Sequence, residues 1–360
     1  MVVCSNELRT ALSYDDVLLV PRASSVESRR DIKLNTRISE KLELSIPLIS
    51  TNMDSVTGVE MAVALGKLGG MGILPRFDSP EVQAEKISKI KGAGVVAAAS
   101  LGCKEGYKAT TEILVKAGAD VILMDVAHGH LEKFVNATKY IAERYGDTVT
   151  IIAGVIATYD GACALFESGA DAVRVGVGPG SICTTRIVTG HGVPQMTAIW
   201  DAKKAAEKYG KAIIADGGAK NSGDIVKALA AGVAAVTLGN LFAGTDEAPG
   251  EIIELNGKKY KEYNGSTSKK EKIRQIGKYS QDKNEEYVGH TEGVEALVQY
   301  KGSLLGVVED LLAGVRSGFS YSGAKDLQEL WKNAEFIQIT PAGMRESNAH
   351  DVIINRSELA

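Results

Sequence analysis

The chain has 360 residues, of which 44% are hydrophobic and 24% charged, as in typical soluble globular proteins. A net charge of −4 gives no reason to expect binding to nucleic acid or to a membrane surface. The sequence has no apolar run long enough to span a bilayer and no signal-peptide pattern, and its four cysteines are too scattered for a disulfide framework or a zinc site. We therefore expect a cytoplasmic protein.

Short apolar runs alternate along the chain with stretches of helical periodicity. Near-continuous apolar strands separated by helices are typical of a parallel sheet. Eight such units predict an α/β fold, a (β/α)8 TIM barrel. The main alternative is a doubly wound open sheet, but no Gly-x-Gly-x-x-Gly motif opens a helix after the first strand. The predicted strands are residues 47–50, 71–74, 95–100, 121–125, 150–154, 172–176, 212–216 and 235–239, and the helices between them include 80–91, 106–117, 131–145, 159–168, 196–209 and 222–231.

The region after the eighth predicted strand has a different character. Residues 256–301 are polar and rich in lysine and lack a core pattern. Segments of this length are often lids over a site, and the plain alternative is a solvated surface excursion. We expect a mobile flap here, inside a single catalytic domain that covers residues 1–360. A final helix at residues 304–317 and a tail at residues 340–352 follow.

The segment from Gly176 to Arg186 is the most informative part of the sequence. Three glycines and a proline lead into Cys183, and two threonines and an arginine follow it directly. The segment comes straight after a predicted strand. Backbone N–H groups of a glycine-rich turn can approach an anion closely, and oriented amides favour a thiolate. We interpret the segment as a phosphate-binding turn beside a nucleophile. The alternative is an ordinary glycine loop with an inert cysteine.

Other polar residues cluster where the predicted strands end. In a TIM barrel the carboxyl ends of the strands carry the active site, so this placement favours the catalytic interpretation. His128 and His130 belong to one such cluster, although a histidine at a strand end often only bonds the backbone. The segments concerned are residues 52–55, 125–130, 216–218 and 239–240.

Together these residues resemble the IMP dehydrogenase / GMP reductase family, and the similarity extends from residues 12–21 to residues 345–352. The resemblance implies a TIM barrel and an enzyme that oxidises IMP to XMP with NAD, by way of a thioimidate on Cys183. Dehydrogenases of this family usually carry two CBS modules after the second strand. Here residues 76–95 leave no room for them, so we expect no CBS domains.

The resemblance also implies which residues hydrolyse the thioimidate. A Thr-Glu pair of the family matches Thr185 and Glu292. The family's Arg-Tyr pair on the flap corresponds to Lys278 and Tyr279. Lysine can hold the charge but lacks the planar guanidinium, so this departure bears on the hydrolytic step.

Ligand contacts follow from the same resemblance. Asp216 would accept the ribose hydroxyls of IMP, although an aspartate there could also simply cap a loop. Asp125 would contact the nicotinamide ribose of NAD. The other expected substrate contacts are Ser181, Gly217, Gly218, Gly239, Asn240, Tyr263, Gly265 and Ser266, and the other expected cofactor contacts are Gly176 and Gly178.

A monovalent cation, K+, is implied as well, since the family's dehydrogenases bind one through backbone carbonyls. The cation site would lie at a subunit boundary of a homotetramer, with ligands from two chains. Its expected ligands are Gly178, Gly180 and Cys183 of one subunit and Glu346, Ser347 and Asn348 of its neighbour. A carbonyl ligand does not depend on the side chain.

Several segments discriminate between the two activities of the family. Those that favour a dehydrogenase are residues 187–195, the tail at residues 345–347, and Tyr279 with Glu292. Those that favour a GMP reductase, which converts GMP to IMP with NADPH, are residues 265–268 and Asn52, together with the missing CBS modules. We favour the dehydrogenase. A third hypothesis, a purine-nucleotide-binding protein without catalysis, conflicts with the intact cysteine loop.

Overall fold

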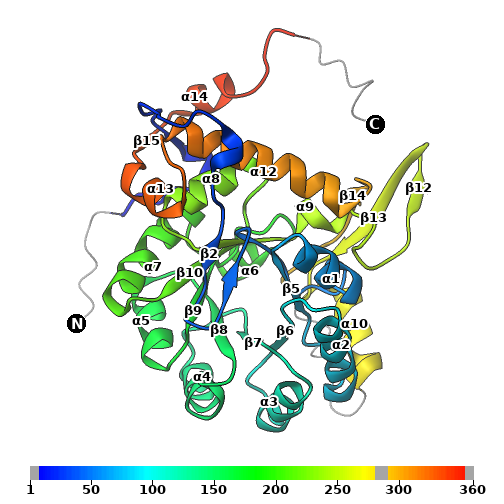
Figure 1. Cartoon of the computed structure of the whole chain (residues 1–360). Coiled ribbons are helices and arrows are strands. Elements are labelled where there is room, and N and C mark those ends of the chain that lie inside the picture. The colour runs from blue at the N-terminus through cyan, green and yellow to red at the C-terminus, as the bar shows by residue number, and fades with distance from the viewer. Residues whose placement is uncertain (1–7, 280–290, 353–360) are drawn as a thin grey trace.

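Eight parallel strands close into a barrel in the computed structural model, which describes residues 8–279 and 291–352 without the side chains of residues 277–279 (Figure 1). The barrel closes where the last strand pairs in parallel with the first, Val236 with Leu48 and Leu238 with Ser50. The predicted TIM barrel is therefore confirmed. Its strands are β4 (Leu48–Ser50), β5 (Met71–Leu74), β6 (Ala98–Leu101), β7 (Val121–Asp125), β8 (Thr150–Ile156), β9 (Ala172–Val175), β10 (Ala212–Asp216) and β11 (Ala235–Leu238).

Helices surround the barrel, as the periodicity predicts (Figure 1). Local signals set their ends: Ser79 accepts a hydrogen bond from the Val82 N–H at the start of one helix, and Pro80 occupies its first turn. The helices are α1 (Val59–Lys67), α2 (Pro80–Gly92), α3 (Tyr107–Lys116), α4 (Glu132–Tyr145), α5 (Tyr159–Glu167), α7 (Gln195–Tyr209), α8 (Ser222–Ala230) and α12 (Leu304–Tyr321), with the short α6 (Thr185–Thr189) and α9 (Asn240–Ala243). The helix predicted to be the last, α12, continues past its predicted end at residue 317, and two short helices follow it. No helix of the described segments is both long and apolar enough to cross a membrane.

The core has two layers. One lies between the strands and the surrounding helices, and the other fills the barrel, where Ile49, Met71 and Ile214 are fully or almost fully buried. A hairpin of β2 (Thr36–Arg37) and β3 (Glu43–Leu44) closes the amino-terminal end of the barrel. Its apolar residues join the inner layer. They are Ile38, Leu42 and Leu44.

The two ends of the described chain meet outside the barrel. The strand β1 (Val17–Leu19) pairs antiparallel with β15 (Phe336–Gln338), and Val17 lies opposite Gln338. The sequence patterns predict neither strand, because three residues are too few to show an alternation. The short helices α13 (Leu327–Asn333) and α14 (Pro341–Glu346) flank β15.

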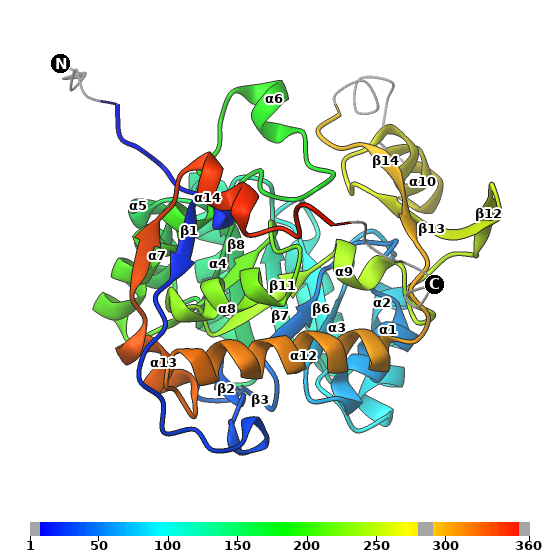
Figure 2. The ribbon, with the colours of Figure 1, turned by 90° about the horizontal axis from the view of Figure 1, so that it is seen from above.

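Much of the polar segment after the barrel is regular structure, which the sequence analysis missed. The strands β12 (Ile253–Leu255), β13 (Lys258–Asn264) and β14 (Glu295–Gln299) form an antiparallel sheet, and α10 (Lys269–Tyr279) follows β13. The sheet and α10 lie at the same end of the barrel as α6, opposite the β2–β3 hairpin (Figure 2). Residues 280–290 of the predicted flap lie outside the described residues, and its mobility stays a prediction.

Candidate active site

The loop that carries Cys183 follows β9 and depends on glycine at several points. A Cβ atom at Gly176, where φ is +151°, would lie 2.0 Å from the carbonyl oxygen of Asp216. A Cβ at Gly178, where φ is +83°, would lie 2.5 Å from Cγ of Arg186. The guanidinium of Arg186 donates hydrogen bonds to the Val177 and Val193 carbonyls at 3.2 and 2.6 Å. Both ends of the loop are therefore tied to one side chain, and Cys183 is left partly exposed.

A short hydrogen-bonded chain begins at the Cys183 thiol. The Sγ atom lies 3.2 Å from Oγ1 of Thr185, which in turn lies 2.8 Å from Oε2 of Glu292. A threonine hydroxyl accepts one hydrogen bond while it donates another, so the thiol can donate to Thr185 and Thr185 to the carboxylate. The arrangement provides a path by which the thiol proton can move toward Glu292.

Backbone contacts hold Glu292 in this position. The Thr184 N–H donates to the carbonyl of Glu292 at 3.2 Å, and the Val294 N–H donates to Ile182 at 3.1 Å. Cys183 and Gly293 form an isolated antiparallel bridge. The segment before β14 thus pairs directly with the cysteine loop, although more than a hundred residues separate them in the sequence.

Several predicted substrate contacts gather beside this loop. Tyr263, on β13, is buried with its hydroxyl hydrogen-bonded to Ser181 and to the backbone of Asn240. Burial raises the pKa of Tyr263 to about 12, against the smaller effect of the Ser181 hydrogen bond, so the phenol stays protonated at neutral pH. A Cβ at Gly239 would lie 2.5 Å from the Tyr263 oxygen, which explains the glycine there.

The turn after β10 lies against the cysteine loop. Gly217 and Gly218 both have φ of +87°, a left-handed conformation that favours glycine. A Cβ at Gly217 would lie 3.1 Å from the backbone nitrogen of Gly180. The two glycine turns therefore approach each other closely.

Two other predicted substrate residues, Gly265 and Ser266, lie between β13 and α10. The Gly265 N–H donates to the Val294 carbonyl at 3.0 Å, and Gln275 donates to the Ser266 carbonyl at 2.8 Å. They are therefore next to the segment that carries Glu292. Lys278 and Tyr279 end α10, but their side chains lie outside the described residues.

The predicted cation ligands fall into two groups. The Gly180 carbonyl accepts a hydrogen bond from the Cys183 N–H at 3.1 Å within the cysteine loop. Glu346 ends α14, Ser347 caps it, and the Asn348 N–H donates to Arg345 at 3.2 Å. The contact between subunits that would join the two groups stays a prediction.

Sequence reasoning missed Arg174, on β9, whose side chain is only 6% exposed. Its Nη1 donates to Oδ1 of Asn52 at 2.7 Å, while Nη2 lies 2.9 Å from Oδ1 of Asp125 and 3.1 Å from Oδ2 of Asp216. Asp125 also accepts from Nε of Arg76 at 3.2 Å. One signal was present in the sequence, since a charged residue interrupts an otherwise apolar strand.

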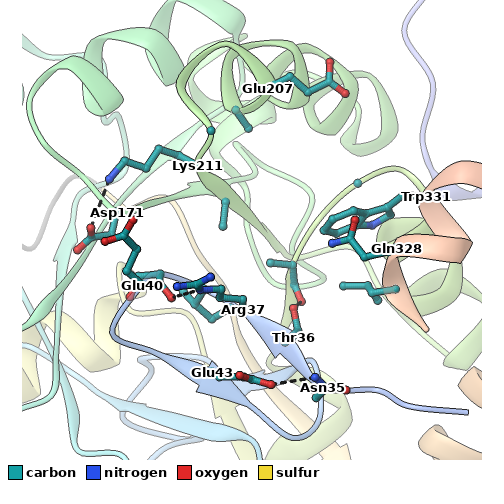
Figure 3. Close-up of a pocket in the computed structure, with 18 of the residues that line it drawn as sticks. Asn35, Thr36, Arg37, Glu40, Glu43, Asp171, Glu207, Lys211, Gln328 and Trp331 are labelled. Atoms are coloured by element: carbon teal, nitrogen blue, oxygen red, sulfur yellow. Dashed lines mark hydrogen bonds and ion pairs between the residues drawn. The ribbon is translucent and has the colours of Figure 1, made fainter.

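A separate cavity of about 1210 Å³ lies at the opposite, amino-terminal end of the barrel (Figure 3). It is lined by the β2–β3 hairpin, α7, α13 and the residues that precede β9, β10 and β11. Asp171 pairs there with Lys41 and Lys211 at 3.3 and 3.4 Å. None of the predicted site residues lines this cavity.

The fold and the site define a (β/α)8-barrel protein with a cysteine-centred site at the carboxyl ends of its strands. A family model described as "IMP dehydrogenase / GMP reductase domain" matches residues 11–350, and the chain therefore belongs to the IMP dehydrogenase / GMP reductase family.

Relatives of known name resemble the chain over almost its whole length. The inosine-5'-monophosphate dehydrogenase of Aquifex aeolicus is 35% identical over 486 aligned positions, which cover 99% of this chain and 98% of that protein. The enzyme of the same name from Cryptosporidium parvum is 38% identical over 387 positions, which cover 95% and 96%. The first alignment is much longer than 360 residues, so the Aquifex protein contains residues with no counterpart here.

Proposed function

We propose that this chain is an IMP dehydrogenase that oxidises IMP to XMP with NAD. The observation that carries the proposal is the chain of hydrogen bonds from Cys183 through Thr185 to Glu292, at the strand-end face of the barrel. A thiol in this setting can lose its proton and attack the C2 carbon of a purine. The names of the similar proteins support the same reaction.

The substrate lies, in this proposal, between the cysteine loop and the turn after β10. The backbone amides near Gly217 and Gly218, the Ser181 hydroxyl and the protonated Tyr263 phenol supply donors for the phosphate. Asp216 accepts the ribose hydroxyls. Glycines at these positions let the backbone approach the ligand closely.

Asp125 is the proposed contact for the nicotinamide ribose of NAD. Its carboxyl group is 17% exposed and held by Arg174 and Arg76, at the strand-end region where a ribose would bind. The residues present therefore fit the cofactor. NAD supplies the acceptor for the hydride that leaves C2 once Cys183 has added to that carbon.

Hydrolysis of the thioimidate then breaks the C–S bond, adds the oxygen of water to C2 and returns the thiol. We assign the activation of this water to Tyr279 with Lys278, and a second proton path to Thr185 and Glu292. The hydrogen bonds of the latter pair support that assignment. The assignment of Tyr279 and Lys278 rests on the family resemblance.

We also infer that the protein works as a homotetramer with K+ bound at subunit boundaries. The carbonyls of Gly178, Gly180 and Cys183 would form one half of each cation site. Glu346, Ser347 and Asn348 of a neighbouring subunit would form the other half. Oxygen ligands of this kind suit a hard cation.

One assay separates the activities of the family. The purified protein is incubated with IMP and NAD, and separately with GMP and NADPH, and the nicotinamide absorbance is followed. Formation of NADH in the first reaction supports the proposal. Oxidation of NADPH in the second reaction, without activity in the first, would instead identify a GMP reductase. Activity in neither reaction would support the third hypothesis, a purine-nucleotide-binding protein without catalysis.

A further inference from the structure

Two acidic side chains that the proposed function assigns to different ligands meet at one guanidinium. Asp125 comes from β7 and Asp216 from β10, and Nη2 of Arg174 lies 2.9 and 3.1 Å from their nearest oxygens. Arg174 itself is 6% exposed, while the two carboxylates are 17% and 20% exposed. A desolvated cation thus lies between the cofactor carboxylate and the substrate carboxylate.

The guanidinium is held in a fixed orientation. Its Nη1 donates to Asn52 at 2.7 Å, and Asn52 donates in turn to Ser100 at 3.1 Å. The Ser100 hydroxyl donates to the Leu74 carbonyl at 2.8 Å. These hydrogen bonds fix the plane of the Arg174 guanidinium. The ammonium group of a lysine is not planar and could not be oriented in the same way.

Burial and the neighbouring charges affect the pKa of Asp216. Burial raises the pKa of Asp216, Arg174 lowers it, and the negative charge of Asp125 raises it again. Arg76 faces Asp125 from the loop after β5. Tyr14 and Tyr263 also face Asp216, but burial raises the pKa of both phenols, so both stay neutral between pH 6 and pH 9. Arg174 is therefore the cation that both carboxylates share, and without it burial and the charge of Asp125 would raise the pKa of Asp216 further.

We propose that Arg174 is a positioning residue that holds Asp125 and Asp216 in place and opposes protonation of Asp216, so that the riboses of cofactor and substrate both meet preformed acceptors. The proposal rests on the proposed function for the identity of the two ligands. The charge arrangement itself does not depend on it. Because one side chain contacts both carboxylates, we expect its loss to lower the affinity for both ligands.

The first test needs no ligand. Difference potentiometric titration between pH 9 and pH 6 compares the wild-type protein with Arg174→Met. We expect the variant to take up as much as about one additional proton, the one that Asp216 retains without its cation. The matched control is Arg186→Met, which removes a guanidinium bonded only to carbonyls among the described residues and should add no such proton. No additional uptake in Arg174→Met, or equal uptake in both variants, overturns the proposal. Arg174→Gln replaces the methionine variant if that protein does not fold.

The second test uses steady-state kinetics with IMP and NAD from pH 7 to pH 9. In Arg174→Met we expect KM for both ligands to rise about tenfold or more at pH 7 and KM for IMP to fall toward wild type at pH 9, with a smaller change in kcat. Arg174→Lys keeps a charge, so its KM values should rise less and stay independent of pH. An equal rise at every pH would show a merely structural role. If wild-type protein does not oxidise IMP, the proposed function fails, and the titration still decides the role of Arg174.

Discussion

The two ends of the barrel both carry many charged residues, yet they use them differently. At the amino-terminal end, Asp171 pairs with Lys211 (Figure 3) and with Lys41. The side chains of these lysines are 38% and 32% exposed. At the carboxyl end, Arg174 is almost completely buried and contacts two carboxylates and an amide. A cavity and many charges are therefore not enough to mark a site. Desolvated charges that converge on a few atoms are the better sign.

The hydration of the charged groups explains why the two ends differ energetically. An exposed ion pair typically contributes between 0 and about 1 kcal/mol, because water competes for both charges. A buried pair loses several kcal/mol of hydration per ion and is weak evidence for stability. Both ends hold largely buried carboxylates, since Asp171 is 13% exposed and Asp125 17%, but the cation is buried only in the Arg174 cluster, where we expect the charges to be used. The following variants test this contrast, beginning with the largest expected effect.

Replacement of the nucleophile should cause the largest loss at the carboxyl end. Cys183→Ala removes the thiol that begins the hydrogen-bonded chain, and we expect turnover of IMP to fall by about a thousandfold or more. Binding of IMP, measured by equilibrium dialysis, should remain close to wild type. Substantial residual turnover in this variant would contradict the covalent mechanism.

The flap should control the second half of the reaction. Tyr279→Phe removes the proposed water activator, and we expect product formation to slow by about a hundredfold to ten-thousandfold. Hydride transfer should be less affected, so a single-turnover experiment should show a burst of NADH followed by a slow steady state. Lys278→Arg restores the family's guanidinium and should leave activity equal or higher. If Tyr279→Phe slows neither step, the flap does not activate water here.

The Thr185–Glu292 pair should have an intermediate effect. Glu292→Gln keeps the shape of the side chain but cannot take up a proton, and we expect kcat to fall by about ten- to a hundredfold. Thr185→Val breaks the same path one step earlier and should lower kcat by a similar factor. The double variant should be no worse than either single variant, since both act on one path. Additive losses would show that the two residues act separately.

A smaller effect is expected from the cation. Replacement of sodium by potassium should raise activity several-fold, because the larger ion suits a site built from carbonyl oxygens. Deletion of residues 345–360 should remove the difference between the two salts. A truncated protein with an unchanged potassium response would show that Glu346, Ser347 and Asn348 are not ligands.

The smallest effect is expected at the amino-terminal end. Lys211→Met removes one exposed partner of Asp171, and we expect a loss of less than about 1 kcal/mol in the free energy of unfolding. KM and kcat for IMP should remain within about twofold of wild type. A large loss of activity in this variant would show that the charges at the amino-terminal end also contribute to the reaction.

The sequence predicts the barrel well because its strands are buried on both faces and appear as continuous apolar runs. It predicts the surrounding elements less well. The strands β2 and β3 have two residues each, and β13 begins with two exposed lysines and then buries a third, Lys261, so none of the three shows a clear period. Pairing with distant segments stabilises these strands, and a local pattern does not contain that information.

The site was predicted unevenly for a similar reason. Cys183 and Thr185 are two residues apart, and the sequence places them together directly. Glu292 lies far along the chain, and only the family resemblance linked it to them. Arg174 was missed because its role depends on Asn52, Asp125 and Asp216, which three other strands bring to it.

The pairing of β1 with β15 has a consequence for synthesis of the chain. A ribosome releases residues 17–19 long before residues 336–338, their partners in the sheet. Until then β1 remains an edge with unpaired backbone groups, open to pairing with another nascent chain. The barrel itself also waits for its last strand, because β4 pairs with β11. Native hydrogen exchange on stalled nascent chains should therefore show protection of residues 17–19 only after residue 338 has left the exit tunnel.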